Sequence, residues 1–573
     1  MGCHYKPYTM LQIRCKNNGI TKSFSEGSSL LDVYQEFAAD IHLPYPVVSA
    51  KVNNVSQGLK FRLFQNRDVE FLDAREGSGH RVYVRSLSFV LYKATQDLFP
   101  GSKLFIEHSL CRGYYCNFKK RGQPQQKDAS PVTDDDVENI RQRMQEIIDL
   151  DMPFRRTEAT TEEAIRVFSD RGFSDKVKLL ETSGQLYSDY YTLGDTVDYY
   201  YGPLVPSAGY LKVWGLERYE DGLLLRVPDW NQPDRLAEKM EQPKTFEMFA
   251  EKTHWDIIMR LSNAGDVNKA IMRGHASELI QVSEALQEKK IVQIAEEIAQ
   301  RVKQETRLVL ITGPSSSGKT TFCKRLSIQL LACGLRPLSF STDDYFVNRV
   351  DTPKLPNGDY DFDNIAAVDY ELLEDHLVRL MKGETVEVPE YNFTTGLREW
   401  NGKRLKLQRD AVLIIEGIHA LNPLLTRTVP DETKFKIYIS ALTSISLDDH
   451  NWIPTRDNRL LRRIIRDYNK GAFTARQTIA QWKNVCEAED KWISPFQETA
   501  DVMFNSALNI EFAVLRTHAE LILAQIPRNC PEYGEAHRLL KFIHFFLPVS
   551  DQEIPPTSIM REFVGGSSFK YDR

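Results

Sequence analysis

A glycine-rich loop between an apolar run and an amphipathic segment constrains the fold of this chain more than any other feature. Residues 308–312 have the β-rich apolar composition of a strand buried in a parallel sheet. Residues 313–320 follow with the sequence GPSSSGKT, which fits the pattern G-x-x-x-x-G-K-[ST]. In residues 321–331 the apolar side chains recur at helical spacing. This order of strand, loop and helix predicts a doubly wound α/β fold with a phosphate-binding loop.

The loop contains the groups that hold phosphate. A turn of this kind directs backbone N–H groups and the N-terminus of a helix toward an anion. Lys319 adds a positive charge at the same place. The predicted phosphate ligands are Gly313, Ser315, Ser316, Ser317, Gly318, Lys319, Thr320 and Thr321.

Further strand-like runs alternate with helical segments between residues 304 and 530, as in a parallel sheet with helices on both faces. These runs lie at residues 337–341, 411–415 and 435–440. Asp343 and Glu416 come at or just after the ends of two of them. Because ligands gather at the carboxyl ends of parallel strands, we expect these carboxylates to hold Mg²⁺ and its waters beside the loop.

A run of arginines follows the last of these strands. It comprises Arg459, Arg462, Arg463 and Arg466, at positions i, i+3, i+4 and i+7 of a predicted helix. Like charges at this spacing destabilise an isolated helix, so the arrangement favours an anionic ligand such as a triphosphate. We expect Arg459 and Arg463 to contact phosphate. The alternative is a solvated helix face partly paired with Asp457 and Asp467.

Composition limits the classes of protein to which the chain can belong. Its 573 residues carry 73 basic and 79 acidic side chains, and the net charge of -6 argues against non-specific coating of nucleic acid. The eight cysteines show no paired metal-type spacing, which indicates a reduced, cytoplasmic setting. The apolar runs fall short of the ~20 residues of a membrane helix, so no membrane association is expected. The oligomeric state stays open.

Several motifs together resemble those of the uridine/cytidine kinase family, within the group that includes phosphoribulokinases and bacterial pantothenate kinases. The resemblance spans about 220 residues and depends on the order and spacing of six segments. They are residues 313–320, Thr342-Asp343-Asp344-Tyr345, Tyr360–Asp363, Pro389–Phe393, Glu416-Gly417-Ile418 and Arg459–Asp467.

The resemblance implies an ATP-dependent and Mg²⁺-dependent phosphotransferase with an alcohol acceptor. Asp343 would be the general base that accepts the proton of a nucleoside 5′-hydroxyl. Lys319 would neutralise phosphate charge. Thr320 and Glu416 would hold Mg²⁺, while Arg459 and Arg463 would belong to a mobile lid.

The same resemblance assigns residues to the acceptor. Asp363 would hold the ribose hydroxyls, and Tyr391 and Phe393 would form the wall of a base pocket. Arg398, at the end of the following segment, is a further substrate-binding candidate. Gly396 stands where the uridine kinases carry a histidine that recognises the pyrimidine, so the identity of the acceptor stays open.

The N-terminal half resembles threonyl-tRNA synthetases. Residues 11–15 and 48–52 alternate like strands, residues 29–37 are typical of a helix, and their order resembles the β-grasp TGS domain. Residues 91–118 and 201–206 resemble the editing-type domain. At the positions of its metal ligands this chain has Arg85, Phe89, Tyr200 and Leu204, none of which can replace an imidazole or a thiolate. The editing chemistry is therefore expected to be absent.

These resemblances predict a multidomain α/β protein of five parts. A TGS-like domain covers residues 1–76 and an editing-like domain without metal ligands covers 77–230. A helical linker follows at 231–303, then a P-loop kinase domain at 304–530. A C-terminal tail occupies 531–573.

Three functional hypotheses follow. The first is a nucleoside kinase of the uridine kinase type that transfers the γ-phosphate of ATP to a 5′-hydroxyl. The second is a kinase for another hydroxyl-bearing metabolite, which the glycine at position 396 keeps open. The third is an RNA-linked protein in which the N-terminal half contacts tRNA and the loop acts as a nucleotide switch.

Overall fold

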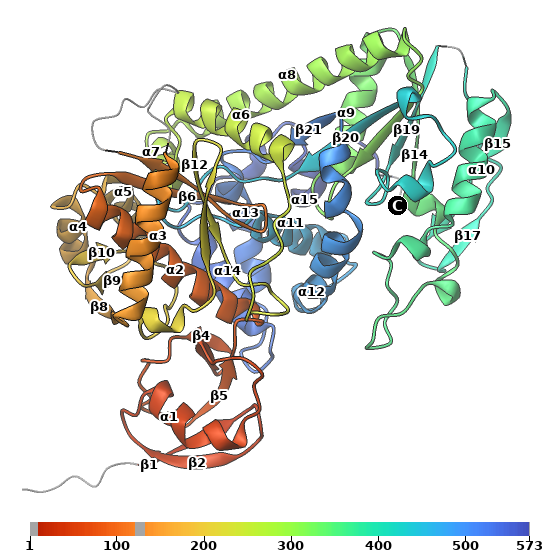
Figure 1. The fold of residues 1–573 in the computed structure, drawn as a ribbon. Coiled ribbons are helices and arrows are strands. Elements are labelled where there is room, and N and C mark those ends of the chain that lie inside the picture. Colours follow the sequence, from red (N-terminus) through yellow and green to blue (C-terminus); the bar gives the residue numbers. More distant parts are fainter. Residues whose placement is uncertain (1–9, 121–131, 409, 572–573) are drawn as a thin grey trace, which may run out of the picture.

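A computed structural model describes residues 10–120, 132–408 and 410–571 (Figure 1). The predicted multidomain α/β class is confirmed, with a five-stranded parallel sheet in the C-terminal half and mixed and antiparallel sheets in the N-terminal half. No helix in these ranges is both long and apolar enough to cross a membrane.

The N-terminal unit is a five-stranded mixed sheet with one helix across it. The strand order is β2-β1-β5-β3-β4, with β1 parallel to β5 and the other pairs antiparallel. Ser29 caps the helix and forms a capping box with Asp32. The elements are β1 Met10–Cys15, β2 Thr21–Ser25, α1 Leu30–Phe37, β3 Ser49–Val52, β4 Val55–Gln57 and β5 Arg67–Leu72.

The second unit packs two antiparallel sheets around the buried helix α2 (Gly77–Leu98). One sheet comprises β6 Lys103–Leu110, β7 Gly113–Lys119, β11 Gly215–Tyr219 and β12 Gly222–Arg226, and the other β8 Phe154–Thr160, β9 Tyr187–Leu193 and β10 Thr196–Asp198. Its other helices are α3 Asp134–Asp149, α4 Thr161–Ser169 and α5 Ser174–Ser183. Arg85, Phe89, Tyr200 and Leu204, the four residues that the resemblance aligned with metal ligands, all have buried side chains.

Three helices lie between the two halves, within the predicted helical linker. They are α6 Pro243–Met259, α7 Ala264–Met272 and α8 Ala276–Val302. The long helix α8 crosses the top of the molecule in Figure 1 and leads into the central strand of the parallel sheet. Its buried residues Ile291, Ile294 and Ile298 belong to the core that covers this sheet.

The parallel sheet has the strand order β14-β19-β13-β20-β21. The four strands that the sequence predicts are present, and β21 (Val502–Asn505) is an additional edge strand. The sheet comprises β13 Leu308–Thr312, β14 Arg336–Ser341, β19 Ala411–Glu416, β20 Lys434–Ser440 and β21. Its flanking elements include α9 Lys319–Ala332, α10 Tyr370–Met381, α12 Ala475–Trp492 and α13 Glu511–Leu523, and the small strands β15 Thr385–Glu387, β16 Glu390–Asn392, β17 Leu397–Glu399 and β18 Arg404–Lys406.

The C-terminal residues pack into the body of the protein. Helix α14 (Tyr533–Ile543) buries Leu539, Phe542 and Ile543 in one core with residues of α4, α5, α11 (Thr455–Asn469) and α13. Asn54 of the N-terminal unit donates a hydrogen bond from its side chain to the carbonyl of Arg528. The last described helix, α15 (Arg561–Val564), lies against α11.

A buried charge cluster joins the two halves of the chain. Lys176 of α5 is 0% exposed and forms ion pairs of 3.0 Å with Asp198 and with Asp448, which follows β20. His450 contacts Asp198 at 2.7 Å. Although burial lowers the pKa of Lys176, the carboxylates of Asp198 and Asp448 outweigh it and hold that pKa well above its usual value. The synthetase-like unit and the parallel-sheet unit therefore share one polar core.

Replacing this lysine is expected to destabilise the whole protein. Lys176→Met leaves two carboxylates buried without their cation, which costs about 3–5 kcal/mol of unfolding free energy. Lys269→Met removes a largely exposed ion pair with Glu181 and is expected to cost less than about 1 kcal/mol. Urea denaturation of the full chain measures both values. Equal stability of the two variants would contradict the coupling.

Candidate active site

The glycine-rich loop leaves the central strand of the parallel sheet. All five residues of β13 are buried. The Thr312 hydroxyl donates hydrogen bonds to the carbonyls of Gly417 (3.0 Å) and Ile418 (2.7 Å), which fix the loop against the end of β19. Gly318, with φ of 87°, stands at the N-cap of α9, where a left-handed backbone favours glycine. The helix α9 thus starts at the end of the loop, and its first-turn N–H groups lie beside the loop.

Lys319 of the loop lies within electrostatic range of several carboxylates. Its ammonium donates a 3.1 Å hydrogen bond to the Pro314 carbonyl, inside the loop itself. Burial lowers the pKa of Lys319, and the nearby charges of Glu416, Asp343 and Glu562 oppose that shift. The sequence-predicted residues Lys319, Asp343 and Glu416 are therefore close in space, joined by a carboxylate near the end of the chain.

Thr320 and Glu416 form a pair at the carboxyl end of β19. The Thr320 hydroxyl donates to a Glu416 carboxylate oxygen at 3.4 Å. Across the described residues no three His, Cys, Asp or Glu side chains gather into a metal site. A hydroxyl and a carboxylate nevertheless suit Mg²⁺, which takes few protein ligands and completes its shell with phosphate and water oxygens. The buried hydroxyls of Ser316 and Ser317, without hydrogen-bond partners among those residues, also fit a polar ligand at the loop.

Asp343 and Asp363 come from separate loops to the same place. Asp343 lies in a short 3₁₀ turn, Thr342–Tyr345, where its backbone N–H donates to the Ser341 hydroxyl. Burial raises the pKa of Asp363, and the Arg463 guanidinium opposes this rise while Asp343 reinforces it. Two carboxylates, the loop lysine and an arginine of α11 thus lie within electrostatic reach of one another.

The arginines of α11 support the loop from within the protein. Arg459 donates to the Ser315 carbonyl (3.2 Å), Arg462 to the Ser316 carbonyl (3.3 Å) and Arg463 to the Ser315 hydroxyl (2.9 Å). Arg459 and Arg462 are 1% and 0% exposed, and their charges are paired with Glu489 and Glu511 respectively. Arg459 and Arg462 therefore do not lie on a solvated face. Arg463 and Arg466 are partly exposed and pair with Asp467 at 3.4 Å and 3.1 Å, as the alternative predicted for that residue.

An aromatic group lies beside the carboxylates. The Tyr391 and Phe393 rings meet edge to face, with centroids 5.0 Å apart. Phe346 contacts both, at 5.4 Å and 6.1 Å, and Phe362, next to Asp363, lies 6.5 Å from Tyr391. Tyr391 is buried, whereas Phe393 is partly exposed. Of these four rings, Tyr391 and Phe393 were predicted from the sequence, and Phe346 and Phe362 were not.

An arginine fills the space beside Gly396. Gly396 has φ of 74°, and a Cβ there would lie 2.8 Å from the guanidinium carbon of Arg349. The Arg349 backbone N–H donates to the Gly396 carbonyl at 2.8 Å, and its side chain bonds the Phe393 carbonyl. Arg398 instead pairs with Asp369, the N-cap residue of α10, at 2.7 Å. Arg349, which the sequence analysis missed, therefore contacts the aromatic group through Phe393.

His419 is a second residue that the sequence analysis missed. It is 1% exposed, and neither ring nitrogen has a hydrogen-bond partner in the described part of the chain. Burial lowers the pKa of His419 to about 4, and the Asp363 backbone and Lys319 are close enough to affect that value. Its place three residues after Glu416, at a strand end, was the available signal.

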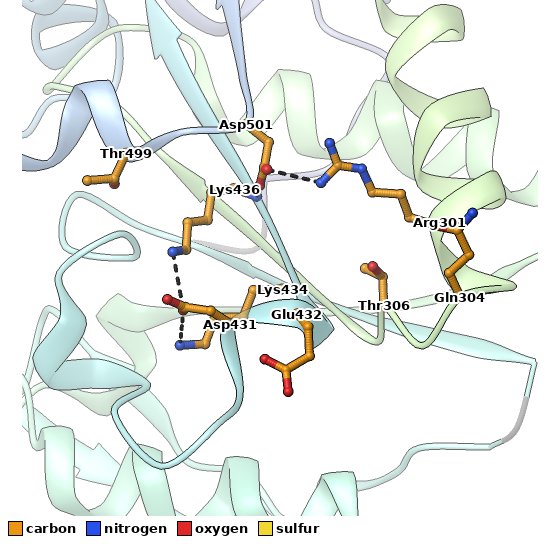
Figure 2. Close-up of a pocket in the computed structure, with 9 residues that line it drawn as sticks. All are labelled: Arg301, Gln304, Thr306, Asp431, Glu432, Lys434, Lys436, Thr499 and Asp501. Atoms are coloured by element: carbon orange, nitrogen blue, oxygen red, sulfur yellow. Dashed lines mark hydrogen bonds and ion pairs between the residues drawn. The ribbon is translucent and has the colours of Figure 1, made fainter.

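A polar cavity of about 460 Å³ lies at the amino ends of the strands, at the end of the sheet away from the loop (Figure 2). Lys434 and Lys436 of β20 both pair with Asp431, and Arg301 pairs with Asp501. These ion pairs neutralise the charges of the cavity. Ligands of such sheets bind at the carboxyl ends of the strands, so this cavity at their amino ends is separate from the candidate site.

Comparison with known proteins identifies the parallel-sheet unit. Residues 308–511 match the phosphoribulokinase / uridine kinase family. This part of the chain is a domain of that family. It carries the P-loop, both carboxylate loops and the arginine helix described above.

The N-terminal part is homologous to threonyl-tRNA synthetases. Threonine–tRNA ligases from Marinobacter nauticus and Desulforamulus reducens are 28% and 30% identical over 202 and 204 residues, which is 35% of this chain. The chain spans only about 30% of the length of these relatives.

Two solved kinase structures are similar to part of the chain. One, titled a possible uridine kinase from Bacillus stearothermophilus, is 21% identical and covers 36% of this chain and 100% of its own, with a TM-score of 0.25. A D-glycerate 3-kinase from Cryptococcus neoformans is 14% identical and covers 38% and 92%, with a TM-score of 0.28.

The contact between Gly396 and Arg349 can be tested with a matched pair of glycines. Gly396→Ala and Gly402→Ala both place a Cβ on a left-handed backbone, which costs about 1–2 kcal/mol. Only the first meets a side chain, so we expect it to cost about 1–3 kcal/mol more. Equal unfolding free energies in urea would show that the space beside Gly396 is open.

Proposed function

We propose that this chain is an ATP-dependent kinase of the uridine kinase type, which transfers the γ-phosphate to a hydroxyl group of a small molecule. One observation supports this most. Groups that are distant in sequence meet at the loop: the Thr320 hydroxyl donates to Glu416 at 3.4 Å, and Arg463 of α11 donates to the Ser315 hydroxyl at 2.9 Å. A cation-lined loop beside two carboxylates suits phosphoryl transfer to an alcohol.

In the proposed reaction the acceptor oxygen attacks the γ-phosphorus, its proton passes to the Asp343 carboxylate, and ADP leaves. Lys319 and Arg463 stabilise the charge on the transferring group. Thr320 and Glu416 would hold Mg²⁺, which supplies further neutralisation of phosphate charge when bound. Arg459 is committed to Glu489 and the Ser315 carbonyl, so we assign it to holding the loop.

The acceptor site is proposed between Asp363 and the aromatic group. The Asp363 carboxylate suits paired hydroxyls such as those of ribose, and the edge of Phe393 suits a flat ring. Arg349 carries donors and a positive charge beside Gly396, where uridine kinases have a histidine. We therefore favour a nucleoside whose base presents carbonyl oxygens, with an anionic hydroxyl-bearing metabolite as the second candidate acceptor.

A panel of acceptors distinguishes these candidates. ADP release from ATP and Mg²⁺ is measured with the full chain and with nucleosides, sugar phosphates or hydroxy acids. A rise with nucleosides supports the first acceptor class, and a rise only with anionic acceptors supports the second. If no acceptor raises turnover above that with ATP alone, the proposed kinase activity is wrong.

We propose a scaffold role for the synthetase-like half. The four side chains aligned with metal ligands are buried and packed, and the Lys176 cluster joins this half to the kinase domain. Contact with tRNA is the alternative, and binding at low ionic strength in a filter assay would support it, since phosphate contacts are strongest there.

Asp343→Asn is expected to lower turnover by about two orders of magnitude or more, because the general base is lost. ATP binding should persist, since the loop is unchanged. Asp359→Asn alters an exposed carboxylate on a nearby loop and is the matched control. Calorimetric ATP titration and steady-state kinetics measure the two effects. Near-normal turnover of Asp343→Asn would reassign the base, with Asp344 as the next candidate.

Arg349→Gln tests recognition of the acceptor. Removing a charged donor is expected to raise the acceptor KM by about tenfold or more, while the KM for ATP stays unchanged. Arg379→Gln, which alters an exposed arginine on α10, is the control. An unchanged acceptor KM would place the acceptor away from Arg349.

A further inference from the structure

A carboxylate from the end of the chain is bound to the phosphate loop. Glu562 of α15 accepts a 3.2 Å hydrogen bond from the backbone N–H of Thr321 and a 2.6 Å hydrogen bond from its hydroxyl. Thr321 lies in the first turn of α9, directly after Lys319 and Thr320. The donor and acceptor are 241 residues apart in sequence.

The groups that Glu562 contacts are those that a nucleotide needs. In loops of this pattern the backbone N–H groups around the helix N-terminus cradle the α- and β-phosphates. An anion is favoured there because the N–H groups are unsatisfied and carry the positive end of the helix dipole. Glu562 satisfies one of these donors and adds a negative charge near Lys319. A phosphate group and this carboxylate therefore compete for the same site.

The neighbouring residues also cover the loop. Ile559 lies against Gly318, so that a Cβ at position 318 would overlap its side chain. The Tyr571 hydroxyl lies 2.9 Å from the Thr321 hydroxyl, and the Ser567 hydroxyl accepts a hydrogen bond of 3.1 Å from Tyr571. Residues 559–571 thus approach the loop from its helix side at three points.

One part of this segment is buried and the other is partly exposed. Ile559 and Phe563 are buried, the Asn469 side chain donates to the Phe563 carbonyl at 3.0 Å, and Ser558 bonds Glu284 of α8. After α15 come Gly565 and Gly566, with φ of 90° and 74°, where the chain turns. Glu562 and Tyr571 are partly exposed. Displacement of the carboxylate therefore requires no loss of the buried anchor.

We propose that residues 561–571 are a built-in occupant of the nucleotide site, in which the Glu562 carboxylate takes the place of a nucleotide phosphate until ATP displaces it. The identity of the displacing ligand as ATP rests on the proposed function. The segment lowers the apparent affinity for ATP, because only the fraction of molecules in which Glu562 has left the loop can bind.

Calorimetric titration of ATP into the full chain tests this proposal. Glu562→Ala is expected to lower the apparent Kd by about tenfold, which corresponds to an open fraction of about one in ten in the unaltered protein. Glu553→Ala removes an exposed carboxylate from the same C-terminal region and is expected to leave the Kd unchanged. A Kd of Glu562→Ala within about twofold of the unaltered protein would overturn the proposal.

Hydrogen exchange of the unaltered protein gives a second measurement that does not depend on any variant. Saturating ATP is expected to speed amide exchange in residues 565–571, which follow the buried anchor, while the buried strand β13 stays protected. Unchanged exchange in this segment, with ATP bound, would also overturn the proposal.

Neither the ATP titration nor the hydrogen-exchange measurement requires an acceptor. Their outcomes are therefore independent of the outcome of the kinase assay. An absence of turnover with every acceptor, together with tighter ATP binding by Glu562→Ala, would contradict only the proposed kinase activity. If neither ATP nor inorganic triphosphate binds the unaltered protein or Glu562→Ala, the loop is no phosphate site, and both proposals are wrong.

Discussion

The buried ion pair between Arg462 and Glu511 determines how the loop is held. Arg462 is 0% exposed, and its guanidinium also donates to the carbonyl of Ser316 and to Ser506. A buried charge costs several kcal/mol unless its hydrogen-bonding capacity is fully used, so this side chain permits few alternative positions of its partners. It joins the P-loop, the end of β21 and the start of α13 at one point.

Helix α11, which carries Arg462, connects the loop to the rest of the protein. Asp457 of α11 pairs with Arg538 of α14 at 2.7 Å, and Glu535 of α14 pairs with Arg81 of α2 at 3.1 Å. The guanidinium carbon of Arg462 also lies 4.8 Å from the centre of the Phe563 ring. Ion pairs thus extend from the synthetase-like half to α11, whose arginines donate hydrogen bonds to the loop, and the C-terminal segment packs against Arg462. The loop is therefore connected through α11 to the synthetase-like half and to the C-terminal segment.

The sequence predicted the elements that depend on local patterns. The four strands of the parallel sheet and the helices before and after the loop have close to their expected bounds, because each is an apolar run or a periodic stripe flanked by turn residues. Strand β21 was missed, since its four residues at the sheet edge give little periodicity. The arginine helix was predicted as a helix, but its burial was not, because its acidic partners lie 30 and 49 residues further along the chain.

The residues of the candidate site likewise fall into those that the sequence predicted and those that it did not. Local patterns identified the loop, Asp343 and Glu416 as candidates, because they come at or just after strand ends, and the family resemblance added Asp363. Arg349, His419 and Glu562 carry no such motif, and only the packing of distant segments brings them to the loop. The sequence by itself determined the fold class and the phosphate-binding loop, since hydrophobic periodicity and glycine-dependent turns are local properties. The tertiary structure decided which charges surround that loop, because burial and pairing depend on residues that the chain order does not relate.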